Sequence, residues 1–325
     1  MKILDLKIIG IRSMETVLIT GGGGFIGAHL VALLLEEGYS VTVLDTFCHK
    51  VNSLGHLCHN PQLTIVRGDV RDQELVATLC QNADWIIPLA AMVGAPVCAQ
   101  DPISARAINL DSIRSMLGEL SPEQRILFPV TNSGYGIGDA GKYCDEQSPL
   151  RPISLYGKLK IEAESILMDR GNIVSLRLAT VFGMGSRMRI DLLVNDFVYR
   201  AVRDKALIIF QGHFKRNFIH VRDVANGFYF AMKNFDLMSN ETYNMGLTSA
   251  NLSKLELAER IQRQIPEFVY IEAEIGEDPD KRDYIVSNEK LEATGWKPEY
   301  NIDQGISELV RGYNSIRNEN YSNVI

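Results

Sequence analysis

Two kinds of hydrophobic pattern follow one another at the start of the chain. Residues 16–20 (TVLIT) form a short apolar run rich in β-branched side chains, which predicts a buried strand. In residues 28–37 (AHLVALLLEE) the apolar positions recur with the helical period. Between them stands Gly21-Gly22-Gly23-Gly24-Phe25-Ile26-Gly27. The pattern therefore predicts a glycine-rich turn from a strand into a helix.

The same order of strand and helix recurs along the first half of the chain. Further strands are predicted at 40–44, 63–66, 85–89 and 126–131, and helices at 72–80 and 103–120. Strands that alternate with helices are typical of a parallel sheet with right-handed crossovers. The predicted fold class is α/β, a Rossmann doubly wound parallel sheet with a smaller C-terminal α/β substrate lobe.

The regular alternation weakens beyond about residue 184, which predicts a second lobe. In this part 185–189 is a basic loop, 190–202 is amphipathic and 206–210 is a short strand. We expect an NAD-binding domain over 14–184, to which 218–246 returns, and a substrate lobe over 185–217 and 247–325. Residues 1–13 are an expected N-terminal extension, and Met14 is an alternative translation start.

The glycine turn predicts a diphosphate-binding site. Glycine allows a tight bend and a close approach of the backbone, and the N–H groups at a helix start favour an anion. Both Gly21-x-x-Gly24-x-x-Gly27 and Gly22-x-Gly24-x-x-Gly27 fit the sequence. A tight turn without a ligand is the alternative, because the pattern is permissive.

Acidic and small residues stand where the predicted strands end. Asp45 follows the second strand, eighteen residues beyond Gly27, near the spacing at which an acid binds the adenosine ribose. An acid there favours NAD over NADP, although Lys50 is close by, and an exposed acid is the alternative. Asp69 is placed to accept from the adenine amino group or to cap the next helix. The remaining strand-end candidates for cofactor binding are Val70, Leu89, Ala90 and Ala91.

One tyrosine and one lysine suggest acid–base chemistry. Tyr156 and Lys160 are spaced i, i+4 at the start of an amphipathic segment, so they share one helical face. A phenolate working near neutral pH needs cationic support, which Lys160 and an oxidised nicotinamide ring supply, whereas burial opposes it. Thr131, at the end of the fifth strand, is a candidate for positioning the reacting hydroxyl. Tyr229 and Lys233 repeat the spacing, and we interpret Tyr229 as core packing.

Composition excludes several classes of function. The 325 residues are 46% hydrophobic and carry a formal net charge of −7, which argues against nucleic acid as a partner. No apolar run is long enough to span a membrane. Five cysteines lack the paired spacing of a metal site, so no metal is expected, and reduced thiols favour the cytoplasm.

Taken together, the motifs resemble the extended short-chain dehydrogenase/reductase family that acts on nucleotide-linked sugars. The resemblance covers nearly the whole chain. Its motifs are Gly21-x-x-Gly24-x-x-Gly27, Gly68-Asp69-Val70, Leu89-Ala90-Ala91, Thr131 before Tyr135-Gly136, Tyr156-x-x-x-Lys160 and Arg216-Asn217-Phe218-Ile219-His220-Val221-x-Asp223. It implies Thr131, Tyr156 and Lys160 as the catalytic set, NAD as cofactor, a nucleotide-diphosphate sugar as substrate and a homodimer. It also implies that Arg216 and Arg282 contact the substrate diphosphate.

Departures from the family pattern narrow the expected reaction. Sugar 4,6-dehydratases of the family have Asp-Glu after the threonine, whereas this chain has Asn132-Ser133, so dehydration is disfavoured. Residues 131–138, 187–197 and 276–284 most resemble the branch that oxidises C4 of GDP-manno-heptose for capsules. Besides the two arginines, the resemblance proposes Asn132, Ser133, Arg187 and Asn195 as substrate contacts.

Three reactions and one non-enzymatic role remain open from the sequence. We expect net oxidation at C4 to a 4-keto sugar, with NADH leaving or passing its hydride to a second acceptor such as a 2-oxo acid. A 4-epimerase that uses transient NADH is the main alternative. Less favoured are a 4,6-dehydratase and an NAD-binding sensor, because sensors of this fold usually lack the tyrosine–lysine pair.

Overall fold

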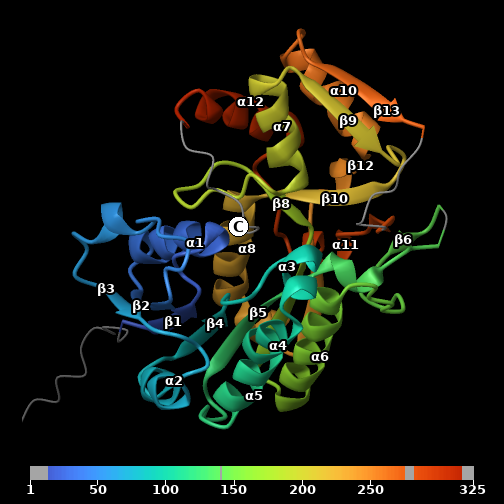
Figure 1. The fold of residues 1–325 in the computed structure, drawn as a ribbon. Coiled ribbons are helices and arrows are strands. Elements are labelled where there is room, and N and C mark those ends of the chain that lie inside the picture. The colour runs from blue at the N-terminus through green and yellow to red at the C-terminus, as the bar shows by residue number, and fades with distance from the viewer. Residues whose placement is uncertain (1–13, 140, 275–281, 317–325) are drawn as a thin grey trace, which may run out of the picture.

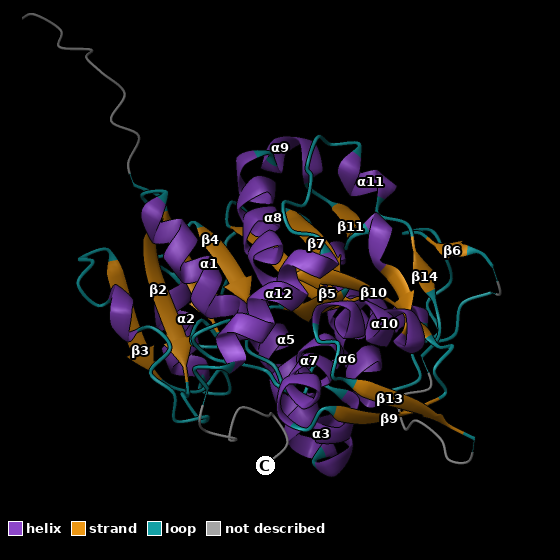
Figure 2. Cartoon of the chain, turned by 90° about the horizontal axis from the view of Figure 1, so that it is seen from above, coloured by secondary structure: helices purple, strands orange, loops and turns teal. Residues whose placement is uncertain are grey.

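A seven-stranded parallel sheet forms the centre of the computed structural model, which describes residues 14–139, 141–274 and 282–316. The strands lie in the order β11-β7-β5-β4-β1-β2-β3 (Figures 1 and 2). Their bounds are β1 Thr16–Thr20, β2 Ser40–Asp45, β3 Leu63–Arg67, β4 Trp85–Pro88, β5 Arg125–Thr131, β7 Ile173–Leu178 and β11 Glu241–Met245. This confirms the Rossmann-like fold class. The strand order reverses between β1 and β4, where folds of this kind bind ligands.

Alternate residues of each strand face opposite sides of the sheet, and each side has its own core. Val17 and Ile19 pack in one hydrophobic cluster, and Leu18 between them packs in the other. The first cluster includes helices α1 (Phe25–Glu36) and α8 (Val221–Lys233). The second includes α2 (Gln73–Cys80) and α6 (Leu155–Arg170). The central strands are buried on both faces and therefore read as apolar runs. The sequence predicted β1, β2, β3, β4 and β5 to within one residue at each end, whereas β7 and β11 were not predicted.

The predicted helix at 103–120 is confirmed over most of its length, but a π-helical turn that was not predicted lies inside it. The structure has α4 at Pro102–Arg106, a π-helical turn at Ala107–Asp111 and α5 at Ser112–Leu117. The wider turn carries Asn109, whose amide nitrogen donates to the Met92 carbonyl at 2.9 Å and whose oxygen accepts from the Met92 N–H at 2.8 Å. These bonds hold the segment after β4 against the helix. A short helix there, α3 (Ala95–Gln100), was not predicted.

The smaller lobe is built from two small sheets and three helices. One sheet has the order β12-β10-β8, and the other pairs β13 with β9. The bounds are β8 Thr180–Phe182, β9 Ala206–Phe210, β10 Lys215–His220, β12 Asn251–Ser253, β13 Val269–Ala273, α7 Leu193–Arg203, α10 Lys254–Gln264 and α12 Ile302–Tyr313. The remaining elements are the pair β6 (Tyr143–Cys144) and β14 (Ile285–Val286), with α9 (Phe235–Met238) and α11 (Glu289–Glu292).

Residues 218–246 divide between the two sheets. Helix α8 packs on α1, and strand β11 pairs with β7 at the edge of the central sheet. Strand β10, however, pairs with β8 and β12 outside that sheet. The predicted return of this segment therefore holds for α8 and β11, and begins after β10. The domain boundaries stay a prediction, and residues 1–13 and 317–325 lie outside the described residues.

Candidate active site

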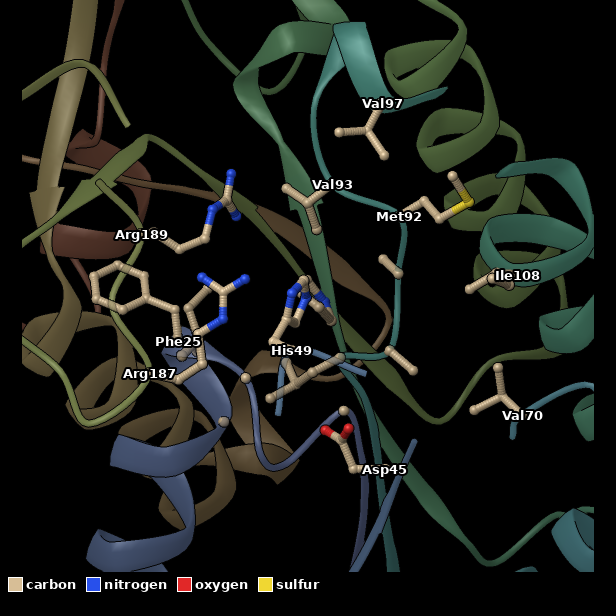
Figure 3. Close-up of a pocket in the computed structure, with 18 of the residues that line it drawn as sticks. Phe25, Asp45, His49, Val70, Met92, Val93, Val97, Ile108, Arg187 and Arg189 are labelled. Atoms are coloured by element: carbon tan, nitrogen blue, oxygen red, sulfur yellow. The ribbon is translucent and has the colours of Figure 1, made fainter. Parts of the chain in front are cut away.

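A cavity of about 430 Å³ opens at the carboxyl ends of β1, β2, β4 and β5. This volume is within the usual range for small-molecule sites. Figure 3 shows part of its lining, with Asp45 at the end of β2 and Val70 after β3. Every residue that the sequence proposed for cofactor binding lines it, namely Gly21, Gly24, Phe25, Ile26, Gly27, Asp45, Asp69, Val70, Leu89, Ala90 and Ala91. The proposed catalytic residues Thr131, Tyr156 and Lys160 line it too.

The glycine turn has a backbone that larger residues do not fit. Gly21 has φ +74°, and a Cβ atom there would lie 2.6 Å from the backbone nitrogen of Ala90. At Gly27 a Cβ would lie 2.5 Å from the Gly21 carbonyl oxygen, so this glycine lets α1 start close to β1. Of the four consecutive glycines, Gly21 and Gly24 line the cavity. The geometry therefore favours the Gly21-x-x-Gly24-x-x-Gly27 register over the alternative.

Asp45 both lines the cavity and fixes the glycine turn. Its Oδ2 accepts from the Gly23 N–H at 2.9 Å, and its Oδ1 accepts from the Phe47 N–H at 2.7 Å. The carboxylate is half-buried. Its orientation is therefore set before any ribose hydroxyl approaches. The bond to Gly23 was not predicted, because nothing in the spacing of the two residues indicates it.

Asp69 does not cap the following helix. The cap of α2 is Asp72, whose carboxylate accepts from the Leu75 N–H at 3.1 Å. Asp69 instead forms an ion pair with Arg71 at 2.7 Å, and the hydrogen bond from this guanidinium holds the pKa of the carboxyl below its usual value. The capping alternative for Asp69 is wrong, and its contact with adenine stays a prediction.

Helix α6 presents Tyr156 and Lys160 to the cavity from its first turns. The helix begins after Ser154, whose hydroxyl accepts from the Gly157 N–H at 3.1 Å. A Cβ at Gly157 would lie 3.4 Å from the Ser133 carbonyl oxygen, so glycine allows α6 to pack closely on the segment that follows β5. This packing brings Thr131, at the end of β5, to the same cavity as the two α6 residues.

Burial favours the neutral forms of both α6 side chains. Burial raises the pKa of Tyr156 to about 12 and lowers the pKa of Lys160 to about 7. The Lys160 ammonium nitrogen lies 3.9 Å from the centre of the Phe128 ring. The cationic support that the sequence predicted for a phenolate therefore does not outweigh the effect of burial on the pKa of Tyr156. The positively charged nicotinamide ring of NAD would lower this pKa further.

Thr131 belongs to a chain of hydrogen bonds that crosses to the C-terminal part of the protein. Its hydroxyl donates to the Ser133 hydroxyl at 2.8 Å and accepts from the Ser133 N–H at 3.1 Å. Arg282 also donates to the Ser133 hydroxyl. The Thr131 hydroxyl is thus paired with Ser133, and as a rotatable donor and acceptor it is suited to hold a substrate hydroxyl at the cavity.

Asn132 is buried with unsatisfied polar atoms. The residue is 1% exposed, and within the described residues neither its amide nitrogen nor its amide oxygen has a hydrogen-bond partner. Such a group costs free energy unless a ligand or water pairs with it. Asn132, Ser133 and Arg282 do not line the cavity, but they adjoin Thr131 in sequence or through hydrogen bonds.

Two proposed substrate contacts lie away from the cavity. Asn195 is fully buried and bonds to the Gly183 N–H at 3.0 Å and the Arg189 carbonyl at 2.9 Å, so it supports the loop after β8. Arg216 is 3% exposed, donates to the Lys215 carbonyl and lies over the Tyr284 ring. For Asn195 the structure indicates a positioning role in place of direct contact.

The two arginines of the expected basic loop at 185–189 are buried. Arg187 and Arg189 are 3% and 8% exposed, and both line the cavity (Figure 3). Arg189 forms a bidentate ion pair with Asp191, at 2.8 Å from Nε and 2.6 Å from Nη2. The cavity also has lining residues that the sequence reasoning missed, namely His49, Met92, Ile108 and Arg189.

Tyr229 lies outside the cavity and, as predicted, packs against the hydrophobic core. Its hydroxyl donates to the Glu37 carboxylate at 2.5 Å, and its ring packs edge-on against Tyr39. The residue is half-buried at the α1–α8 contact. Its spacing to Lys233 therefore matches the catalytic pattern by coincidence.

Three further expectations concern metal sites, cysteine thiols and membrane-spanning helices. The described residues contain no group of three acidic, histidine or cysteine side chains that could hold a metal ion. All five cysteines are free thiols. None of the described helices has the length and apolar content to cross a lipid bilayer.

A doubly wound sheet with a glycine turn, an acid after β2 and a tyrosine–lysine pair in one cavity defines a dinucleotide-dependent enzyme. The chain belongs to the NAD dependent epimerase/dehydratase family, which it matches over residues 17–246. It is an enzyme, and its cofactor is NAD. Both expectations are confirmed.

Individual relatives show how widely the family is represented. The chain is 31% identical to UDP-glucuronic acid decarboxylase 2 of Arabidopsis thaliana, over 95% of this chain and 70% of that protein. It is 28% identical to a putative UDP-glucose 4-epimerase of Methanocaldococcus jannaschii, over 94% and 99%. The structure of Thermus thermophilus UDP-glucose 4-epimerase in complex with NAD superposes with a TM-score of 0.77 at 25% identity, over 92% of this chain and 99% of that one.

Proposed function

We propose that this enzyme oxidises C4 of a nucleotide-linked sugar, GDP-manno-heptose, to a 4-keto sugar. One observation supports the chemistry above all others. Thr131, Tyr156 and Lys160 line the same cavity as the glycine turn. A cofactor bound at the turn and a sugar beside Tyr156 would therefore share one cavity. When bound there, NAD supplies the hydride acceptor.

Each of the three side chains has a distinct role in this proposal. The Tyr156 phenolate takes the proton of the C4 hydroxyl, and the Lys160 ammonium supports that phenolate and holds the cofactor ribose. Thr131 positions the same hydroxyl by donating to its oxygen, with its own proton turned from Ser133 to the substrate, because the single proton of the C4 hydroxyl goes to Tyr156. The arrangement orients the C4 hydroxyl before the proton moves.

The side chains after Thr131 favour oxidation over dehydration. Removal of water needs an acid and a base beside the sugar, and Asn132 and Ser133 provide no carboxyl group. The amide of Asn132, buried without a partner among the described residues, and the Ser133 hydroxyl are suited to bind sugar hydroxyls instead. The Tyr156–Lys160 pair likewise argues against a sensor without catalysis.

The choice of a heptose rests on sequence blocks that pack together. Residues 131–138 and 282–284 both resemble the GDP-heptose branch, and they meet through the Arg282–Ser133 bond and a 2.9 Å bond from the Gly138 N–H to the Asp283 carbonyl. We propose Arg282 and Arg216 for the substrate diphosphate. The base and the sugar are the parts of the proposal that most need an experiment.

A 4-epimerase is the second candidate. The M. jannaschii and T. thermophilus relatives carry that activity in their names. The same three side chains serve both reactions, and the difference lies in whether the hydride returns to the opposite face of the sugar. Net oxidation requires release of NADH or a second acceptor, for which we propose a 2-oxo acid. A homodimer and a cytoplasmic location stay predictions.

Mass analysis of the product tests the proposal. The enzyme is incubated with GDP-manno-heptose and NAD, with and without 2-oxoglutarate as a 2-oxo acid. Loss of two hydrogens from the sugar supports oxidation. An unchanged mass with an inverted C4 centre supports epimerisation, and loss of water shows dehydration. No reaction of the GDP-sugar, with turnover of a UDP-sugar, overturns the proposed substrate.

A further inference from the structure

A buried arginine faces the cavity beside the glycine turn. Arg187 lies in the loop between β8 and α7, is 3% exposed and lines the cavity with Gly24. Figure 3 shows it beside Phe25, the first residue of α1, and near His49. It interacts electrostatically with Asp45, Cys48 and His49. Arg187 therefore lies toward the end of β2, the adenosine side of the cavity.

Hydrogen bonds fix this loop relative to the glycine turn. The Ser186 hydroxyl donates to the Ser53 carbonyl at 2.9 Å, and the Ser53 hydroxyl donates to the Gly23 carbonyl at 2.7 Å. On the other side of Arg187, a ring nitrogen of His29 in α1 lies 2.9 Å from the Met184 carbonyl. Ser53 is fully buried. The position of Arg187 is thus set by the cofactor-binding segments themselves.

The charges around Arg187 favour an anion in the cavity. Burial, and next the like charge of Arg189, lower the pKa of Arg187, so its charge is costly here. The Arg187 guanidinium donates to the Met188 carbonyl within the loop, and Asp191 and Asp45 raise its pKa by less than burial and Arg189 lower it. An anion that touches the Arg187 guanidinium would offset this cost.

The start of α1 lies on the opposite wall, where the nearest carboxylate in the lining, Asp45, accepts from the Gly23 N–H. Helix α1 has no acidic residue in its first turn and no side-chain hydrogen bond at its N-cap, Gly24. Its first N–H groups are therefore available to a phosphate. A guanidinium and a helix start that line one cavity present donors from two directions, which suits a diphosphate with oxygens on both sides.

We propose that Arg187 binds the diphosphate of NAD from the side opposite the glycine turn. This assigns the residue to the cofactor, in place of the sugar diphosphate that the sequence resemblance implied. The proposal rests on NAD as the cofactor and is independent of the reaction at C4. In this proposal the Ser186–Ser53 hydrogen bond helps to fix the distance between Arg187 and the glycine turn.

Binding measurements on cofactor-free protein test the proposal. Calorimetry with NAD, ADP and adenosine compares ligands with and without the diphosphate. Arg187→Gln is expected to raise the Kd of NAD and ADP by about 10- to 100-fold, the usual size of a charge-assisted contact, and to leave adenosine unchanged. Arg187→Lys is expected to raise the Kd of NAD and ADP by a smaller factor. The control is Arg200→Gln, which removes an exposed arginine from α7 and is expected to change no Kd.

Two results would overturn the proposal. Unchanged affinity for NAD and ADP, with weaker binding of GDP or UDP, would return Arg187 to the sugar-nucleotide site. An equal loss for adenosine and ADP, with a lowered Tm, would show a structural role alone. If Arg187→Gln does not fold, Arg187→Lys decides the question through the ratio of ADP to adenosine affinity, which must fall if the guanidinium binds the diphosphate.

Discussion

At the scale of single residues, Tyr156 and Lys160 have their pKa values shifted toward the neutral forms by the same cause. Burial disfavours the phenolate and the ammonium alike, so the side chains around Tyr156 do not by themselves favour the phenolate that proton abstraction needs. The cationic ring of bound NAD offsets part of this cost. Cofactor binding and acid–base competence are therefore coupled through charge.

Replacing Tyr156 by phenylalanine tests its role in proton transfer. The change removes only the hydroxyl, so we expect turnover to be lost while NAD still binds with nearly unchanged affinity. Steady-state rates and NAD calorimetry measure the two effects. Tyr229→Phe is the control, since that hydroxyl bonds to Glu37 away from the cavity, and it should lose little rate. Retained turnover in the Tyr156 variant would reject the assignment.

Replacing Lys160 by methionine tests the cost of its burial. The folded pKa is about 7 and the unfolded value is about 10.4, so between these values the unfolded chain binds more protons. The cofactor-free protein should therefore gain stability as pH rises from about 7 to about 10. Lys160→Met should be more stable than the natural protein near pH 6 and should lack most of that gain. Urea midpoints across this range measure it, and parallel profiles would contradict it.

At the scale of elements, the π-helical turn between α4 and α5 holds the segment after β4 in place. Asn109 pairs with both backbone groups of Met92, and Met92 and Ile108 line the cavity. A regular helix would rotate Asn109 away from this position. The interruption of the helix therefore contributes directly to the wall of the site.

Replacing Asn109 by alanine tests this element. The Met92 N–H would lose its partner in a part-buried position, and the Met92 carbonyl would keep only the Cys98 thiol, which should lower the free energy of unfolding by about 1–3 kcal/mol. Chemical denaturation measures the change. Asn82→Ala is the control, because that side chain makes one exposed bond to the Thr78 carbonyl. An equal effect of the two substitutions would show that the turn does not depend on Asn109.

At the scale of the whole molecule, Glu308 on α12 connects parts that are distant in sequence. Its carboxylate accepts from the Met184 N–H at 3.1 Å and from Arg222 at the start of α8, and it lies 3.2 Å from a ring nitrogen of His220. Burial raises its pKa, but His220, Met184 and Arg222 outweigh burial and lower it to about 2. The group thus ties α12 to the loop that carries Arg187.

Replacing Glu308 by glutamine tests this connection through pH. The folded pKa lies below the unfolded value of about 4.3, so the carboxylate stabilises the fold above that value and the effect is lost as pH falls toward 2. The variant should be less stable than the natural protein at pH 7, and the gap should narrow between about pH 4.5 and 2.5. Urea midpoints measure it. A gap independent of pH would show that the charge of Glu308 does not matter.

Several features of the site followed from local sequence. The glycine turn, Asp45 and the Tyr156–Lys160 spacing could be predicted because strand ends of a parallel sheet meet at one edge and an i, i+4 pair shares a helical face. The burial of Arg187 and the role of Asn195 could not. Each depends on which distant segment covers it, and no local pattern carries that information.

The sequence by itself determined the α/β class, the parallel sheet and the position of its ligand edge, because period and turn chemistry are local properties of the chain. It also identified the residues of the acid–base pair. Only the tertiary structure decided where the helix before β5 contains a π-helical turn, and which wall each arginine lines. These depend on contacts between residues far apart in the chain, where burial and charge act together on each side chain.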